Sequence, residues 1–161
     1  MSIIKANKWQ STSGIQYTNV INTYVAKNTG ALYSTTSAWA PVPGMNITKN
    51  FTIGNLILCM CEVSLRTQNA AQSHPGLTFF LNGTNVGNAS YGLCISQCPA
   101  GPTHTTAFIT HTFIAGQISN TIEFQGTRSV AGQDSLTFAG EASGSLADYK
   151  QGRLIVMEIA Q

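Results

Sequence analysis

Four cysteines and three histidines are the residues of this chain that could bind a metal or act as nucleophiles. Cys59 and Cys61 lie two apart in a very apolar segment, which predicts a strand with both thiols on one face. A zinc site of paired cysteines is conceivable, but Cys-x-Cys is not the usual knuckle spacing. We therefore expect Cys59 and Cys61 to be buried thiols that pack as small apolar side chains.

Cys94 and Cys98 are four residues apart beside a proline and a glycine, a composition typical of a loop. A disulfide and a metal site both stay open for this pair, with His74, His104 or His111 as a further ligand in the second case. The histidines are scattered along the chain. His104 and His111 are seven apart on one expected strand, which places them on opposite faces.

No pattern of an enzyme accompanies these residues. The sequence has no Gly-x-Ser-x-Gly elbow, no phosphate-binding loop and no His-Glu-x-x-His. Its six acids form no recognisable pair or Asp-rich loop: Glu62, Glu123, Asp134, Glu141, Asp148 and Glu158. We expect no enzymatic activity and no cofactor.

The composition is that of a folded protein with a neutral polar surface. Charged residues make up 9% of the 161 residues, against roughly 25% in an ordinary soluble domain, while 43% are hydrophobic. The net charge of +2 supplies no basic patch for nucleic-acid binding. So little charge leaves little repulsion between copies, which suits a stable assembly.

Targeting signals are not visible. Residues 1–10 have no apolar core of a signal peptide, so we expect reduced thiols and read the four Asn-x-Ser/Thr sequons as chance. The apolar run 152–161 is too short to span a membrane, and we expect no membrane insertion. Because a chain end is usually polar and frayed, this run predicts a paired and buried terminal strand.

The elements that position these side chains are short strands of β-branched and aromatic residues separated by Gly, Pro and Asn-Gly. Apolar residues occupy both the odd and the even positions in 55–65, which predicts a strand covered on both faces. Asn82-Gly83 predicts a hairpin turn. Further strands are expected in 105–115, 120–125, 135–139 and 154–159. This spacing predicts an all-β antiparallel sandwich or jelly roll.

The first 19 residues differ from the rest. They are polar, with Trp9 as their single tryptophan, and the strand pattern begins at Val20. We expect an extended N-terminal attachment arm over residues 1–19 and one β-jelly-roll head domain over residues 20–161.

Three blocks, in this order, resemble a domain common at the ends of bacteriophage tail-fibre and related virion proteins. They are Ala38-Trp-Ala-Pro-Val-Pro-Gly-Met-Asn-Ile-Thr48, the apolar strand 55–67 with its Phe-Phe-Leu-Asn-Gly hairpin, and the ending Gly152-Arg-Leu-Ile-Val-Met-Glu-Ile-Ala160. The chain departs from the family at Asn55, where the family has a lysine, and at Cys59 and Cys61, where it has aliphatic residues. Only a short arm precedes the head, whereas a typical fibre has a long shaft.

The resemblance implies a jelly roll like those of tumour-necrosis-factor and complement heads, assembled as a homotrimer in the virion. One face of strand 55–65 would fill the sandwich and the other would meet sister subunits. The residues assigned to the trimer core are Leu56, Leu58, Met60, Ile155 and Met157. Those assigned to attachment to other virion proteins, of tail or capsid, are Ile3, Ile4 and Trp9.

Two functions follow from the resemblance. The first is a short trimeric tail fibre or receptor-binding knob, whose partner is a host surface glycan or protein. The alternative is a trimeric capsid decoration or head-fibre protein. Tyr91 and its Gly/Asn-rich turns suggest a shallow glycan surface, but the preferred interpretation of Tyr17, Tyr24, Tyr33 and Tyr91 is half-buried strand packing.

Overall fold

The computed structural model describes residues 9–10, 16–17, 20–30, 32–34, 38–67, 73–99, 104–128, 136–138 and 152–160. Within these ranges the chain is all β. The strands are β1 (Trp9–Gln10), β2 (Gln16–Tyr17), β3 (Val20–Lys27), β4 (Leu32–Ser34), β5 (Ala40–Asn50), β6 (Leu56–Thr67), β7 (Pro75–Leu81), β8 (Thr84–Asn85), β9 (Cys94–Ile95), β10 (His104–Ile114), β11 (Ser119–Arg128), β12 (Leu136–Phe138) and β13 (Arg153–Ile159). No helix in the described part of the chain could cross a membrane.

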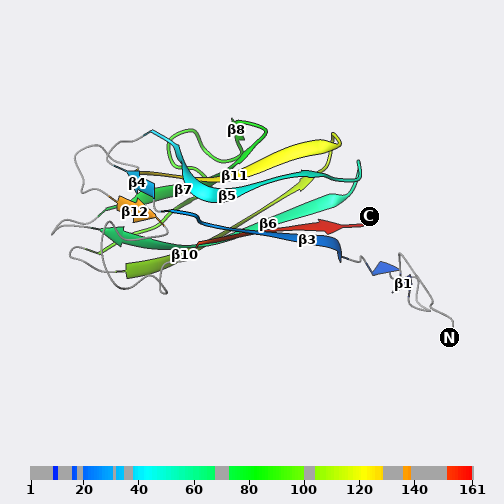
Figure 1. Cartoon of the computed structure of the whole chain (residues 1–161), viewed down its shortest axis with the longest axis horizontal. Coiled ribbons are helices and arrows are strands. Elements are labelled where there is room, and N and C mark those ends of the chain that lie inside the picture. The colour runs from blue at the N-terminus through cyan, green and yellow to red at the C-terminus, as the bar shows by residue number, and fades with distance from the viewer. Residues whose placement is uncertain are drawn as a thin grey trace.

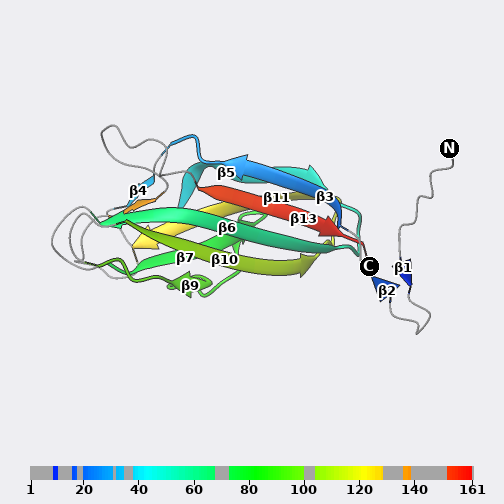
Figure 2. The ribbon, with the colours of Figure 1, turned by 90° about the horizontal axis from the view of Figure 1, so that it is seen from below.

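Two antiparallel sheets pack face to face (Figure 1). In the first sheet the strands lie in the order β3-β13-β6-β10, as Figure 2 shows, and β12 and β4 continue it at one end. In the second the order is β5-β11-β7, with β8 and β9 paired to β7. Taking β3, β5, β6, β7, β9, β10, β11 and β13 as strands one to eight, the two orders are 1-8-3-6 and 2-7-4-5. This is a jelly roll, as the sequence predicts.

Alternation along the strands builds the core between the sheets. In β6, Ile57, Cys59, Cys61, Val63 and Leu65 are buried at every second position. The core also contains Val42, Met45, Ile47, Phe51, Leu77, Phe79, Ile109, Ile122, Phe124, Leu154 and Val156. The rings of Phe79 and Phe124 meet edge to face across β7 and β11 at 6.3 Å.

A turn and a strand bulge each depend on residues with left-handed backbone. Asn82 and Gly83 have φ values of 51° and 81° and join β7 to β8, as the Asn-Gly pair predicts for a hairpin. In β5, Gly44 has a φ of 81°, and a Cβ there would lie 2.7 Å from the carbonyl oxygen of Lys27. Between its register positions at Pro41 and Asn46, β5 holds more residues than the facing part of β11. The strand therefore bulges at Gly44.

The terminal run is a central strand of its sheet. β13 pairs with β3 along one side and with β6 along the other, both antiparallel. Leu154 and Val156 are fully buried. The prediction of a paired and buried terminal strand is confirmed.

The expected arm is described only in part. Its described residues form β1 and β2, which pair antiparallel with Trp9 opposite Tyr17. Ile3, Ile4 and the side chain of Trp9, which the sequence assigns to attachment, lie outside the described residues.

Candidate functional site

The outer face of the β3-β13-β6-β10 sheet carries an unusual amount of apolar surface. Figure 2 views the four strands side by side. Because side chains alternate between the faces of a sheet, the residues between the core positions of β6 point outward. The apolar ones among them are Leu56, Leu58 and Met60, and all three are half-buried in the single chain.

The strand register places apolar residues in rows across this outer face. Met60 is level with Ile155 of β13, and Ile155 is level with Val25 of β3. One step along, Leu58 is level with Met157. The last row contains Val20, Ile159, Leu56 and Ile114. We call these residues, together with Phe108, the apolar face.

Several members of the apolar face are strongly exposed. Val25, Phe108 and Ile114 expose 55%, 60% and 50% of their surface. Single exposed apolar residues are ordinary on proteins, whereas contiguous patches of this kind mark interaction sites. The exposed side chains here share one face of one sheet.

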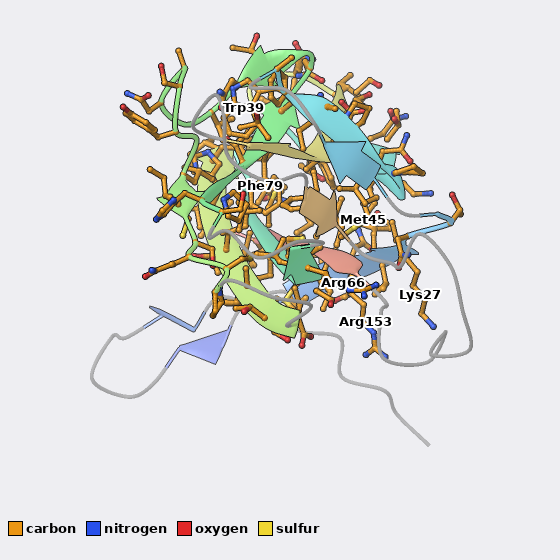
Figure 3. All side chains as sticks on the ribbon, turned by 90° about the vertical axis from the view of Figure 1, so that its left-hand side faces the viewer. Lys27, Trp39, Met45, Arg66, Phe79 and Arg153 are labelled. Atoms are coloured by element: carbon orange, nitrogen blue, oxygen red, sulfur yellow. The ribbon has the colours of Figure 1, made fainter. Side chains whose placement is uncertain are left out.

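Charged side chains on this face are restricted to one end. Lys27, Arg153 and Glu62 are level with one another on β3, β13 and β6, and Arg66 lies farther along β6. Figure 3 shows Lys27, Arg66 and Arg153 on the lower sheet, with Met45 and Phe79 between the sheets. The rest of the apolar face, in the described chain, is free of charge.

The five residues assigned from sequence to the trimer core lie together on this face: Leu56, Leu58, Met60, Ile155 and Met157. The sequence did not assign the other five members of the apolar face to this role: Val20, Val25, Phe108, Ile114 and Ile159. Alternating side chains in 104–114 predict that Phe108 and Ile114 share one face of a strand. Which face that is depends on the pairing of β10 with β6.

The buried cysteines are as predicted. Cys59 and Cys61 each expose 1% of their surface and are free thiols on the inner face of β6. Burial raises the pKa of Cys59 to about 12. It also raises the pKa of Cys61, and the nearby carboxylate of Glu62 adds to that shift.

Cys94 and Cys98 are also free thiols. Cys94 is half-buried and belongs to β9, so it is in a short strand and not in a loop as expected. Cys98 is fully buried, its backbone pairs with Ser73, and burial raises its pKa to about 11. Strand pairing to β7, which no local pattern indicates, explains the difference.

The histidines do not gather. His111 faces inward opposite Cys59, and partial burial lowers its pKa because the charged imidazolium is less well solvated there. His74 is half-buried, and the side chain of His104 lies outside the described residues. Among the described residues, no group of three or more His, Cys, Asp or Glu side chains could hold a metal ion.

Sequence reasoning missed the role of Glu158. Its side chain is 2% exposed. It accepts hydrogen bonds from the Nδ2 of Asn22 at 2.9 Å, the backbone N–H of Thr52 at 2.7 Å and the Nδ2 of Asn55 at 2.8 Å. Burial acts to raise its pKa, but the hydrogen bonds outweigh it and hold the pKa below its usual value. The carboxylate therefore ties β13 to β3 and to the turn before β6.

The tyrosine interpretation is right for Tyr24 and wrong for Tyr91. Tyr24 is half-buried in β3 and packs edge to face on Phe51 at 6.0 Å. Tyr91 is 50% exposed in a turn, where Asn88 Oδ1 accepts from its backbone N–H. The Asx turn places it outside any strand. The side chains of Tyr17 and Tyr33 lie outside the described residues.

Comparison with known proteins gives remote structural similarity alone. No known protein family and no curated protein sequence matches the chain. A chain in the structure of infectious bursal disease virus strain Gx is 12% identical, with a TM-score of 0.43, over 98% of this chain and 45% of that one. Murine APRIL is 11% identical, with a TM-score of 0.43, over 84% of this chain and 99% of that one. A chain of the T13 particle of infectious bursal disease virus is 12% identical, with a TM-score of 0.40, over 85% of this chain and 35% of that one.

The chain thus spans less than half the length of the viral chains to which it is similar. At these identities and TM-scores the similarity assigns no function to it.

Proposed function

We propose that this chain is a structural protein of a bacteriophage virion that assembles as a homotrimer through its apolar face. The single observation that supports this proposal is the apolar face itself, which extends over β3, β13, β6 and β10. A sister subunit is the partner that can cover such a face on every copy. The trimeric number comes from the resemblance of the sequence to phage fibre heads.

Physical chemistry favours association. A Leu, Ile, Val, Phe or Met side chain that goes from exposed to fully buried contributes about 1.5–3 kcal/mol. On the apolar face Val25, Phe108 and Ile114 are the exposed ones. Five more are half-buried in the single chain, so each can add a part of that energy: Leu56, Leu58, Met60, Ile155 and Met157. Association costs about 4–15 kcal/mol in lost freedom. Several such side chains from each subunit can offset that cost. With 9% charged residues, little repulsion opposes the contact.

Light scattering at micromolar concentration tests the assembly. The expected mass is three times the 17.1 kDa of the chain. Leu58→Asp, on the apolar face, should give monomers, because a buried unpaired carboxylate is costly. The matched control is Thr48→Asp, on the exposed outer side of the other sheet, which should stay trimeric. A monomeric wild-type chain would exclude the proposal.

Within the virion, we propose the role of a short tail fibre or receptor-binding knob, with the arm of residues 1–19 attached to other virion proteins. Capsid decoration is the second candidate, which the same resemblance implies. Quantitative mass spectrometry of purified virions separates the two. Copy numbers in the tens or fewer are expected for a fibre, and copy numbers in the hundreds would support decoration.

A further inference from the structure

The outer face of the other sheet differs in chemistry from the apolar face. On β5 and β11, Thr48 and Thr121 share a hydrogen bond between their hydroxyls at 2.9 Å. The next row runs from Asn46 through Glu123 to Phe80. Together with Trp39 and Gln125 this row forms what we call the polar face: Trp39, Asn46, Phe80, Glu123 and Gln125.

A carboxylate at the centre of the polar face is held in place by a neutral group. Gln125 Nε2 donates a hydrogen bond to Glu123 Oε2. Gln125 is 9% exposed, whereas Glu123 is half-buried. In the described part of the chain the side chain of Glu123 makes no other hydrogen bond, so its Oε1 can accept one from a ligand. The amide fixes the carboxylate without neutralising its charge.

An aromatic platform stands beside this carboxylate. The Trp39 indole N–H donates to the carbonyl oxygen of Ala89 at 2.7 Å. The far end of the ring fits over Gly76 and Gly92, where a Cβ would come within 3.1 Å and 2.6 Å of it. The ring of Phe80, the neighbour of Glu123, lies 6.3 Å from that of Trp39. The tryptophan is therefore held in place, and its side chain is half-buried, so part of the ring still contacts solvent.

We infer that the polar face binds a neutral saccharide. A sugar ring presents C–H groups that pack on an aromatic ring, and hydroxyls that donate to a carboxylate; an apolar surface with a few placed polar groups is the usual pattern of a small-ligand site. Asn46 is exposed at the end of the row and supplies both a donor and an acceptor. This inference rests on the proposed receptor-binding role and names its ligand class and site.

Charge argues for a neutral ligand over an anionic one. The side chains of the polar face include one carboxylate and no cation. Lys49, on the adjoining part of β5, lies over the ring of Tyr24 of the other sheet at 5.3 Å from its centroid. A phosphate, a nucleic acid or an acidic glycan would be repelled by Glu123. Figure 3 shows Trp39 on the side of the molecule away from Lys27 and Arg153, so the polar face stays open when the apolar face is covered.

The test is binding of the full-length purified protein to a printed array of neutral, sialylated and sulfated oligosaccharides, followed by titration of a bound neutral one. Glu123→Gln should weaken that affinity at least about tenfold, because a charge-assisted hydrogen bond is lost. Trp39→Phe should also weaken it. Gln117→Ala, in the exposed turn before β11, is the control and should leave affinity unchanged. Melting temperatures and light-scattering masses establish that the variants fold as the wild type does.

The outcomes separate this site from the proposed function. Binding to no neutral glycan, to acidic glycans alone, or equally by wild type and Glu123→Gln overturns the inference, even where the protein is a trimer in the virion. Binding that depends on Glu123, by a chain that is monomeric or missing from virions, supports the site and overturns the proposed assembly.

Discussion

Glu158 is the acidic side chain that β13 turns into the sandwich, next to donors from β3 and from the turn before β6. A buried carboxylate without a cation is tolerated only where hydrogen bonds replace its water. Three donors do so here. At the scale of single residues, the stability of this fold therefore depends on one ionised group in addition to its apolar core.

Glu158→Gln should lower the free energy of unfolding by about 2 kcal/mol or more, because an amide accepts less strongly and turns its own N–H groups toward other donors. Urea unfolding at pH 7 measures this. Glu123→Gln, at a more exposed glutamate, is the matched control and should change stability by about 0.5 kcal/mol or less. Equal losses in the two variants would contradict the role given to Glu158.

The Glu158 contribution should also depend on pH. Its folded pKa is lowered from the ordinary value of 4.5. A lowered folded pKa means that the stabilisation is fully present above about pH 4.5 and is lost as the pH falls through the folded value. The difference in unfolding free energy between wild type and Glu158→Gln should therefore shrink in acid. A difference that stays constant from pH 7 to pH 3 would be inconsistent with this account.

The four thiols should differ in reactivity. The thiolate is the reactive form, and burial raises the pKa of Cys59 to about 12 and that of Cys98 to about 11. In the native protein at pH 8, iodoacetamide should label Cys94 first and Cys59, Cys61 and Cys98 far more slowly. Peptide mass spectrometry measures the order, and the chain in urea, where all four should react alike, serves as the reference. Labelling of Cys59 as fast as Cys94 would show that β6 is not packed as described.

The strands β13 and β6 each separate two different surfaces. Inward side chains of β13, such as Leu154 and Val156, are fully buried in the core. Outward ones, such as Ile155 and Met157, belong to the apolar face. One residue along the strand is thus the difference between the core and the proposed interface.

A charge on β13 should act differently at neighbouring positions. Val156→Asp should destabilise the fold by more than about 4 kcal/mol, because it places an unpaired carboxylate among core residues. Ile155→Asp should leave a folded chain that no longer forms trimers. Circular dichroism melting and light scattering distinguish the two results. Unfolding by both substitutions, or by neither, would mean that β13 does not have this alternation.

The two outer faces of the jelly roll have unlike chemistry. The β3-β13-β6-β10 side is apolar, and the β5-β11-β7 side is polar with aromatic residues. A trimer that covers the first would present the second outward on every subunit. Multivalent presentation of three sites strengthens attachment to a surface without any new contact.

The arm can be separated from the head in an experiment. Deleting residues 1–19 should leave a folded trimer with an unchanged melting temperature that fails to enter virions. Trp9→Ala in the full-length chain should weaken incorporation, because a buried Trp can dominate a small interface. Complementation with each variant and mass spectrometry of the virions measure this. Normal incorporation of the deletion variant would assign attachment to the head.

The long strands, the sandwich, the hairpin at Asn82-Gly83 and the burial of Cys59 and Cys61 could be predicted from the amino-acid sequence, because the alternation of side chains along a strand and the residue preferences of turns are local properties. The short strand β9 could not, because it forms only through its pairing with β7. The sequence also predicts that Leu56, Leu58 and Met60 share one face of β6, because apolar residues occupy both the odd and the even positions of this strand. Which strands are neighbours could not be predicted from the sequence, and the contacts across the sheets follow from that pairing. Pairing places Ile155 level with Met60, brings Asn22 and Asn55 to Glu158, and places Phe80, whose ring packs on Trp39, level with Glu123. These contacts join residues far apart in the chain, and no local pattern records them.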